Sequence, residues 1–499
     1  SIYGNITSNV QSNGRGGALS TNFTKTFSDG WYYKLQGTLK RMGDFETPNY
    51  VMTNTGFSEH NFSFKAGLNR IDHGFDIYYS LFSNRLGILR SSHAHTAIDI
   101  INSIENEIPN VIEDFSYNIN IPRQKISHNL LKLKAFKNFD FGKLVMRYDF
   151  QVNDRKEFDI RRGDGRGKPA LDLNLQTHSL AFDLETKFEN NSNLKAGISG
   201  RYQKNFPDPY TGVKRIIPDY KKYDFSIYSI YDIGLSNQWL LEGGIRYDFS
   251  HINAYKYYRT SLWEARNYDQ LFPEIVVEDL GLNILTNPKF NFNNMSSNLG
   301  TRYTINKGEN IYFNYSISSR KPNPSELFSE GLHHSSARIE IGDLRFNPEV
   351  GHNVSLTYNF VNENSSLTVN SFANFVNDFI YIIPVDLMST IAGVFPYWEY
   401  KQSDANIFGF DIKYEKQYFD NFFIGNQFSI IKGYERDDNK PLVNMPPANL
   451  KNQISYSFPE INNLNLSLES EFVFRQNEYP NNNFEVYIPT EQTYEWLDT

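Results

Sequence analysis

The stretch "LDLNLQTHSLAFDLETKFENNSNLKAGISGRY", Leu171–Tyr202, decides the fold, because apolar residues recur at two-residue steps on both sides of one short polar segment. Successive side chains of a β-strand point to opposite faces of the sheet, so this alternation marks a strand with one apolar face. The segment "ENNSN" has the Asn and Ser residues that favour tight turns. The stretch therefore predicts an antiparallel hairpin, with apolar positions at Leu173, Leu175, Phe182, Leu184 and Phe188, then Leu194, Ala196, Ile198 and Tyr202.

The same hairpin pattern recurs along the chain, with turns near Asp72–Gly74, Asn138–Gly142, Ser236–Asn237 and Asn362–Asn364. Long polar stretches separate the hairpins, and "RRGDGRGKPALD" is one example. A compact soluble domain rarely keeps several loops longer than ~12–15 residues. Alternation of short turns with long loops is typical of an outer-membrane β-barrel, with periplasmic turns and extracellular loops.

Composition favours the same class. Aromatic residues make up 16% of the chain, yet mean hydropathy is −0.53, as expected when strands face lipid on one side and water on the other. No apolar run approaches the ~18–20 residues of a membrane-spanning helix, which excludes a helical membrane protein. The absence of cysteine excludes disulfides, iron–sulfur clusters and thiol nucleophiles, and the net charge of −8 argues against nucleic acid as a partner.

A soluble β-propeller or sandwich is the alternative fold class. It should show a blade-like repeat or short loops at both ends, and the sequence shows neither. We count somewhat fewer than about twenty strand candidates. The prediction is an all-β protein, a large antiparallel transmembrane β-barrel with short periplasmic turns and long extracellular loops. Because the chain opens almost directly into strand-like sequence and ends where another strand starts, we expect a barrel that is incomplete at both ends.

Several stretches, in matching order and spacing, resemble the barrel domain of TonB-dependent outer-membrane receptors. "LLEGGIRYDFS" (Leu240–Ser250) resembles a strand of that family, and "YFNYSISSRKPNPSELFSEGLHH" (Tyr312–His334) resembles its Arg-x-Pro box followed by Glu-Leu. "IEIGDLRFNPEVGHNVSLTYNF" (Ile339–Phe360) resembles the segment that leads into the next strand. The two strands after it are matched by Ser371–Pro384 and Tyr400–Glu415.

The resemblance implies a barrel of the 22-strand type over residues 1–499, with the plug and the last strands missing. It implies an active-transport receptor in the outer membrane of a Gram-negative bacterium. Its cargo would be a metal chelate, namely a ferric siderophore, zinc or haem, imported with TonB acting through the plug. Outer-membrane lipid or lipopolysaccharide is a further expected partner, and no cofactor or enzymatic activity is expected. A passive porin and a soluble β-rich enzyme are the alternatives.

The segment "SEGLHHSSARIE" (Ser329–Glu340) is the leading candidate site, because neutral imidazole is a common ligand of zinc, copper and haem iron. Family haem importers carry a His between an Arg-x-Pro box and an Asn-Pro box. Here Arg320–Pro322 and Phe346–Glu349 bracket the neighbouring histidines His333 and His334. His93 and His95 form a second pair in an H-x-H pattern, which would project two imidazoles to one side of an extended segment. The other interpretation is incidental histidines in solvated loops. The predicted ligand-binding residues are His333, His334, Glu340, Arg320, His93 and His95, with His333 and His334 as metal ligands.

Other polar residues receive simpler interpretations. His60, His73, His128, His178, His251 and His352 are single residues, expected at lumen or rim positions. Arg161, Arg162 and Arg166 are expected in a hydrated loop that contacts lipopolysaccharide or a ferric chelate. No Ser/His/Asp arrangement has supporting context, so a hydrolase is not supported.

Overall fold

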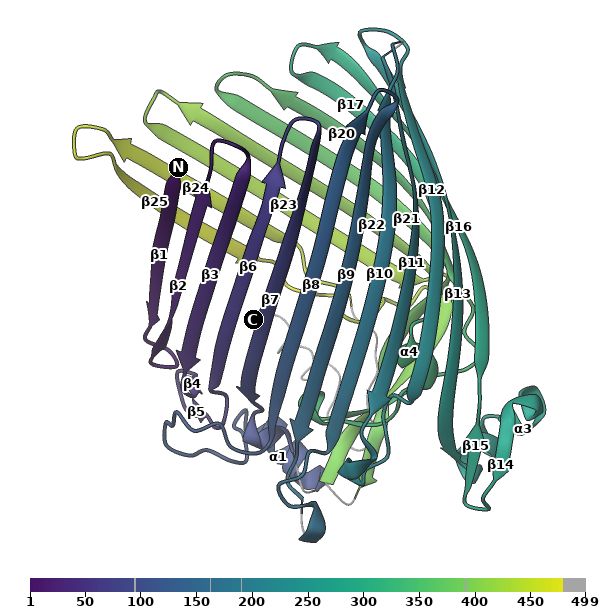
Figure 1. The fold of residues 1–499 in the computed structure, drawn as a ribbon. Helices are drawn as coiled ribbons and strands as arrows, with labels where there is room; N and C mark the ends of the chain where they lie inside the picture. The colour runs from purple at the N-terminus through teal and green to yellow at the C-terminus, as the bar shows by residue number, and fades with distance from the viewer. Residues whose placement is uncertain (94–95, 162, 190, 391–392, 479–499) are drawn as a thin grey trace.

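The computed structural model describes residues 1–93, 96–161, 163–189, 191–390 and 393–478. In this part of the chain, nineteen strands of ten residues or more pair in sequence order, each antiparallel to the next, and they curve into a barrel wall (Figure 1). This confirms the predicted fold class. The strands are β1 (Ile2–Gln11), β2 (Gly16–Thr26), β3 (Trp31–Met42), β6 (Phe57–Asn69), β7 (His73–Gly87), β8 (Arg123–Phe139), β9 (Gly142–Phe158), β10 (Leu171–Lys187), β11 (Ser192–Pro207), β12 (Asp219–Gly234), β13 (Trp239–Arg259), β16 (Lys289–Asn306), β17 (Glu309–Arg320), β20 (Glu349–Val361), β21 (Ser365–Thr390), β22 (Gly393–Tyr418), β23 (Phe422–Glu435), β24 (Asn449–Phe458) and β25 (Leu464–Val473).

The connections alternate between short turns at one end of the barrel and long segments at the other, as predicted. Figure 1 shows the turns at the top and the long segments, with every helix, at the bottom. The strands β21 and β22 are 26 residues each and extend into the long-loop end themselves. The small elements of the long segments are β4 (Phe45–Glu46), β5 (Val51–Met52), α1 (Ala97–Glu105), α2 (Thr260–Ala265), α3 (Tyr268–Leu271), β14 (Val276–Asp279), β15 (Asn283–Thr286), α4 (Pro324–Phe328), β18 (Glu330–His333) and β19 (Arg338–Ile341).

Side-chain alternation gives the wall one apolar and one polar face. On β9, Leu144 and Met146 are exposed, whereas the intervening side chains point to the opposite face. There Arg147 forms an ion pair with Asp183, and Asp183 also accepts a hydrogen bond from Tyr228 Oη at 2.6 Å. An apolar outer face and a polar lumen are the arrangement of a barrel in a bilayer. Within the described residues, no helix combines the length and the apolarity that a membrane span requires.

One short turn depends on glycine. Gly308 joins β16 to β17 with φ of +81°, a conformation that L side chains rarely adopt. A Cβ at this position would overlap the carbonyl oxygen of Val361 in β20. Two constraints, backbone conformation and close strand approach, therefore favour glycine here.

The long-loop end has an apolar core of its own. Trp263 and Tyr268 from the β13–β16 connection pack with Leu327 and Phe328 of α4, and none is more than 1% exposed. Burial of several large side chains stabilises these segments against the strand ends. The connections therefore form a packed cluster at the long-loop end of the barrel.

Candidate functional site

The segment between β17 and β20 begins with a capped helix. Asn323 Oδ1 accepts hydrogen bonds from the backbone N–H groups of Ser325 and Glu326, at 2.9 and 3.0 Å, and Glu326 Oε2 accepts from Asn323 N at 2.7 Å. This capping box satisfies backbone donors at the start of α4. It fixes the direction in which the chain leaves the barrel wall.

Arg320, a predicted ligand-binding residue, forms a fork between two carboxylates. Its Nε and Nη2 donate to the two oxygens of Glu349 at 2.6 Å each, and its Nη1 donates to Glu326 at 2.9 Å. Such charge-assisted pairs are strong and geometrically specific. All three guanidinium nitrogens of Arg320 thus join β17, α4 and β20.

After α4, the hairpin β18–β19 reaches back over the barrel mouth. Within it Glu330 pairs with Ile341 and His333 with Arg338. Its second strand also pairs in parallel with β22, at Glu340 opposite Trp398, so the hairpin joins the wall sheet. Ile339, Ile341 and Phe395 form a small buried core beneath it. This placement carries the two neighbouring histidines to the end of β9.

His333 lies at the centre of a charged network. Its Nδ1 is 2.9 Å from Glu340 Oε1, and its Nε2 is 2.7 Å from Arg155 Nη2. Arg155 also forms an ion pair with Glu157, which accepts hydrogen bonds from Ser335 N and Oγ at 3.1 and 2.9 Å. The His333 side chain is 22% exposed, so part of it remains accessible.

His334 and His93 meet at one carboxylate. Asp159 Oδ2 is 2.8 Å from His334 Nδ1, and Oδ1 is 3.3 Å from His93 Nε2. All three side chains are buried, and His93 also packs edge-on against Phe395. The site thus joins the connections that follow β7, β9 and β17. The sequence placed these histidines in separate loops and left open whether the loops meet.

Burial and pairing shift the ionisation of this cluster. Burial lowers the pKa of His93, with the charge of Asp159 acting in the opposite direction. For Asp159, burial alone would raise the pKa, but the hydrogen bond from His334 and the nearby His93 bring it below the usual value. Glu340 behaves likewise, since His333 and Arg338 outweigh burial and lower its pKa. The carboxylates are therefore held ionised.

The sequence predictions omitted Arg155, Glu157 and Asp159. These residues follow one another at two-residue steps at the end of β9, which projects Arg155 and Glu157 to one face of the wall. That spacing is the available signal, although only the folded loops supply the partners. His95 and Arg162 lie outside the described residues. Among the residues that are described, no group of three or more His, Asp or Glu side chains has the arrangement of a metal site.

The family model described as "TonB dependent receptor-like, beta-barrel" matches residues 2–494.

The chain belongs to the TonB-dependent receptor family.

Barrels of TonB-dependent receptors sit in the Gram-negative outer membrane, so the long-loop end is extracellular and the short turns are periplasmic. The histidine cluster accordingly lies at the extracellular mouth. No curated protein matches the chain. The family consists of transport receptors rather than enzymes.

Solved structures of TonB-dependent receptors share the fold at low identity. A structure of the copper transporter OprC has a TM-score of 0.71 at 12% identity, covering 97% of this chain and 68% of that one. The FrpB iron transporter from Neisseria meningitidis has a TM-score of 0.65 at 13% identity, covering 95% and 69%. The Serratia marcescens hemophore receptor HasR, in complex with HasA and heme, has a TM-score of 0.66 at 13% identity, covering 95% and 73%. At these identities the likeness concerns the fold alone.

Proposed function

We propose that this chain is the barrel of an outer-membrane receptor that binds a metal chelate at its extracellular mouth and imports it with TonB. The observation that carries the proposal is a partly exposed surface formed by Arg155, His333 and Arg338, with side-chain exposures of 29%, 22% and 29%. The guanidinium of Arg338 lies 4.8 Å from the ring centroid of Trp398. Partly exposed cationic and aromatic groups suit an anionic, partly aromatic chelate.

Ferric siderophores, haem and zinc are the candidate cargoes. Structures of transporters or receptors for copper, iron and heme share this fold, which supports a metal-containing cargo without selecting one. His333 and His334 are proposed as cargo contacts and Glu340 as the group that orients His333. For His334, an Nδ1–carboxylate contact leaves Nε2 as the nitrogen for a ligand, the usual arrangement around a metal-bound imidazole.

TonB would act through the plug domain that the family resemblance implies. In that proposal residues 1–499 form the barrel domain of the receptor, in the outer membrane of a Gram-negative bacterium. The barrel residues bind and orient cargo and carry out no covalent chemistry. Arg320 would act indirectly, because its fork fixes α4 and the hairpin that follows it.

The test is binding of zinc, haemin and ferric siderophores to the full-length receptor and to a His333→Ala/His334→Ala variant. We expect the variant to lose affinity for one of these cargoes by about tenfold or more, since a buried polar contact is worth roughly 1–3 kcal/mol. His73→Ala is the matched control, because His73 contacts Asp72 at the periplasmic end. If the double variant binds all cargoes like the parent, the histidines are not contacts. Unsaturable, non-selective uptake would identify a passive porin instead.

A further inference from the structure

Three lysines lie in one row on the outer face of the barrel, near its extracellular end. Lys204 of β11 is directly opposite Lys221 of β12, which is opposite Asn253 of β13, and Asn253 is opposite Lys289 of β16. Each lysine is exposed. Like charges directly opposite in a sheet are destabilising, so an anion bound between Lys204 and Lys221 would stabilise this pair.

The register shows that the row faces outward. Lys204 lies six residues from Ile198, and an even separation along a strand places both side chains on one face. Ile198 is 45% exposed and belongs to the apolar outer wall. The same even separation relates Lys221 to Ile227, which is 48% exposed.

A row of rings lies two residues closer to the membrane centre. Tyr202 is opposite Tyr223, which is opposite His251, and the ring centroids are 5.1 and 6.3 Å apart. His178 and Phe150 continue the row at 4.5 Å. Aromatic girdles mark the boundary between hydrocarbon and headgroups in membrane barrels. The lysine row therefore lies at headgroup level, and His178 and His251 are outward-facing rim residues.

The lysines have no ion-pair partner among the residues that the structure describes. Lys204 has an electrostatic interaction with the carboxylate of Asp219, but Asp219 forms its own ion pair with Arg215. Lys156, at a similar height on β9, differs from these lysines because it has an ion-pair partner. Its Nζ is 2.8 Å from Asp172 Oδ2. The sector formed by β11, β12 and β16 thus presents uncompensated positive charge to the outer leaflet.

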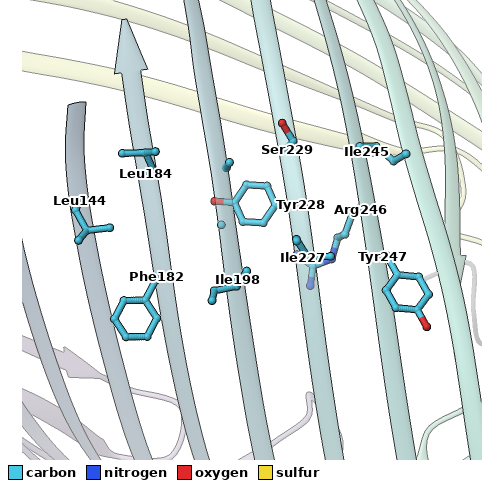
Figure 2. A pocket seen from close by; sticks show the side chains of 12 residues that line it. Leu144, Phe182, Leu184, Ile198, Ile227, Tyr228, Ser229, Ile245, Arg246 and Tyr247 are labelled. Atoms are coloured by element: carbon cyan, nitrogen blue, oxygen red, sulfur yellow. The ribbon is translucent and has the colours of Figure 1, made fainter. Parts of the chain in front are cut away.

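An apolar groove of about 560 Å³ lies on the same wall, on the membrane side of the ring row. Its lining residues come from β9, β10, β11, β12 and β13, with Leu144, Ile198, Ile227 and Ile245 around it (Figure 2). Ala196 opposite Ser229 supplies small side chains at its floor. Lys204 is six residues from Ile198, about 20 Å along the strand and, at a tilt of ~40°, about 15 Å along the bilayer normal. That is roughly the depth of one leaflet.

We propose that this sector is a specific site for lipid A, the phosphorylated anchor of lipopolysaccharide. The lysines bind its phosphates, the ring row contacts its sugars, and the groove holds an acyl chain. Lys204 and Lys289 are three strand spacings apart, about 14 Å, which suits a disaccharide with two phosphates and exceeds a single phosphate. The inference rests on the outer-membrane placement in the proposed function and is independent of cargo.

The test uses the full-length receptor in detergent, with diphosphorylated lipid A titrated by native mass spectrometry. We expect Lys204→Gln/Lys221→Gln/Lys289→Gln to bind on the order of a hundredfold more weakly, since a lysine at an anionic surface contributes roughly a factor of five. Lys187→Gln/Lys307→Gln/Lys401→Gln removes the same charge elsewhere and should bind like the parent. Unchanged affinity in the first variant, or equal affinity for dephosphorylated lipid A or phosphatidylglycerol, would overturn the proposal.

A groove variant separates the acyl chain from the headgroup. Ala196→Phe should weaken lipid A binding about tenfold and leave binding of the deacylated, diphosphorylated disaccharide unchanged, because it fills only the groove. Equal lipid A affinity in Ala196→Phe would remove the groove from the site. Cargo binding on the same preparations distinguishes the two proposals. Lipid A binding without cargo binding counts against the transport proposal alone, and cargo binding without lipid A binding counts against the lipid site alone.

Discussion

His334 Nδ1 lies 2.8 Å from Asp159 Oδ2, although the two residues are 175 positions apart in the chain. The other oxygen of the same carboxylate faces His93 Nε2 at 3.3 Å. Because all three side chains are buried, the carboxylate has little water to replace either partner. One acidic group therefore couples three extracellular connections.

Asp159→Asn should loosen those connections without unfolding the barrel. The amide has no charge and offers an N–H₂ group to one of two imidazoles, so the free energy of local opening should fall by about 1–3 kcal/mol. Hydrogen exchange of residues 88–93 and 330–341 measures this directly. Asp154→Asn is the control, because that carboxylate accepts from Asn174 Nδ2 at 2.6 Å on the outer face. Identical exchange in both variants would contradict the role of Asp159.

Acid should loosen the same loops. The pKa of His93 is lowered from 6.5, so its protonation opposes the folded loops as pH falls below about 6.5. The pKa of Asp159 is lowered from 3.8, so its stabilisation is complete above that value and is lost as pH falls through the lowered pKa. Loop exchange should therefore accelerate, relative to the barrel strands, as pH falls below about 6.5. His93→Gln should remove this step, and a step that persists in that variant would assign it elsewhere.

Arg320→Lys should destabilise the segment between β17 and β20 despite the conserved charge. An ammonium group cannot reproduce the fork on Glu349 while also binding Glu326, so we expect a loss of roughly 2 kcal/mol in local stability. Limited proteolysis of residues 321–348 reports the effect. Arg246→Lys is a matched control, since Arg246 makes a similar fork on Asp248 at 2.7 Å outside this segment. Equal protection in both variants would show that the fork is dispensable.

Gly308→Ala should lower barrel stability by more than about 1 kcal/mol, because Ala is strained at positive φ. The added Cβ also meets the carbonyl oxygen of Val361. Gly37→Ala in β3 is the matched control, since a Cβ there meets no atom within 4 Å. The temperature at which each variant loses its folded gel mobility is the measurement. A smaller effect at Gly308 than at Gly37 would refute the turn argument.

The strands of the barrel wall were predictable because the alternation of apolar and polar residues that marks them is local in sequence. The alternation in Leu171–Tyr202 depends only on the two-residue period of a strand, and the structure pairs Phe182 with Ile198 as that hairpin requires. The Asn and Ser residues of "ENNSN" indicated a turn between the two strands. The same logic located most other hairpins and the alternation of turn lengths.

The site was less predictable because its contacts are long-range. Nothing near His333 in sequence indicates Arg155, and nothing near His93 indicates His334. These residues meet because α4, the hairpin β18–β19 and β22 pack over the end of β9. Whether single histidines such as His178 face lumen or lipid also depends on strand register across the whole sheet.

The parallel pairing of β19 with β22 restricts how the hairpin β18–β19 can move. Residues 339–341 of the hairpin pair with β22, so the hairpin that carries His333 and Arg338 is tied to a strand of the wall sheet. In the proposed transport role, cargo would meet a surface that is already ordered, and little conformational entropy would be lost on binding. Selectivity of such a receptor would then depend on the fixed positions of these side chains rather than on closure of a loop.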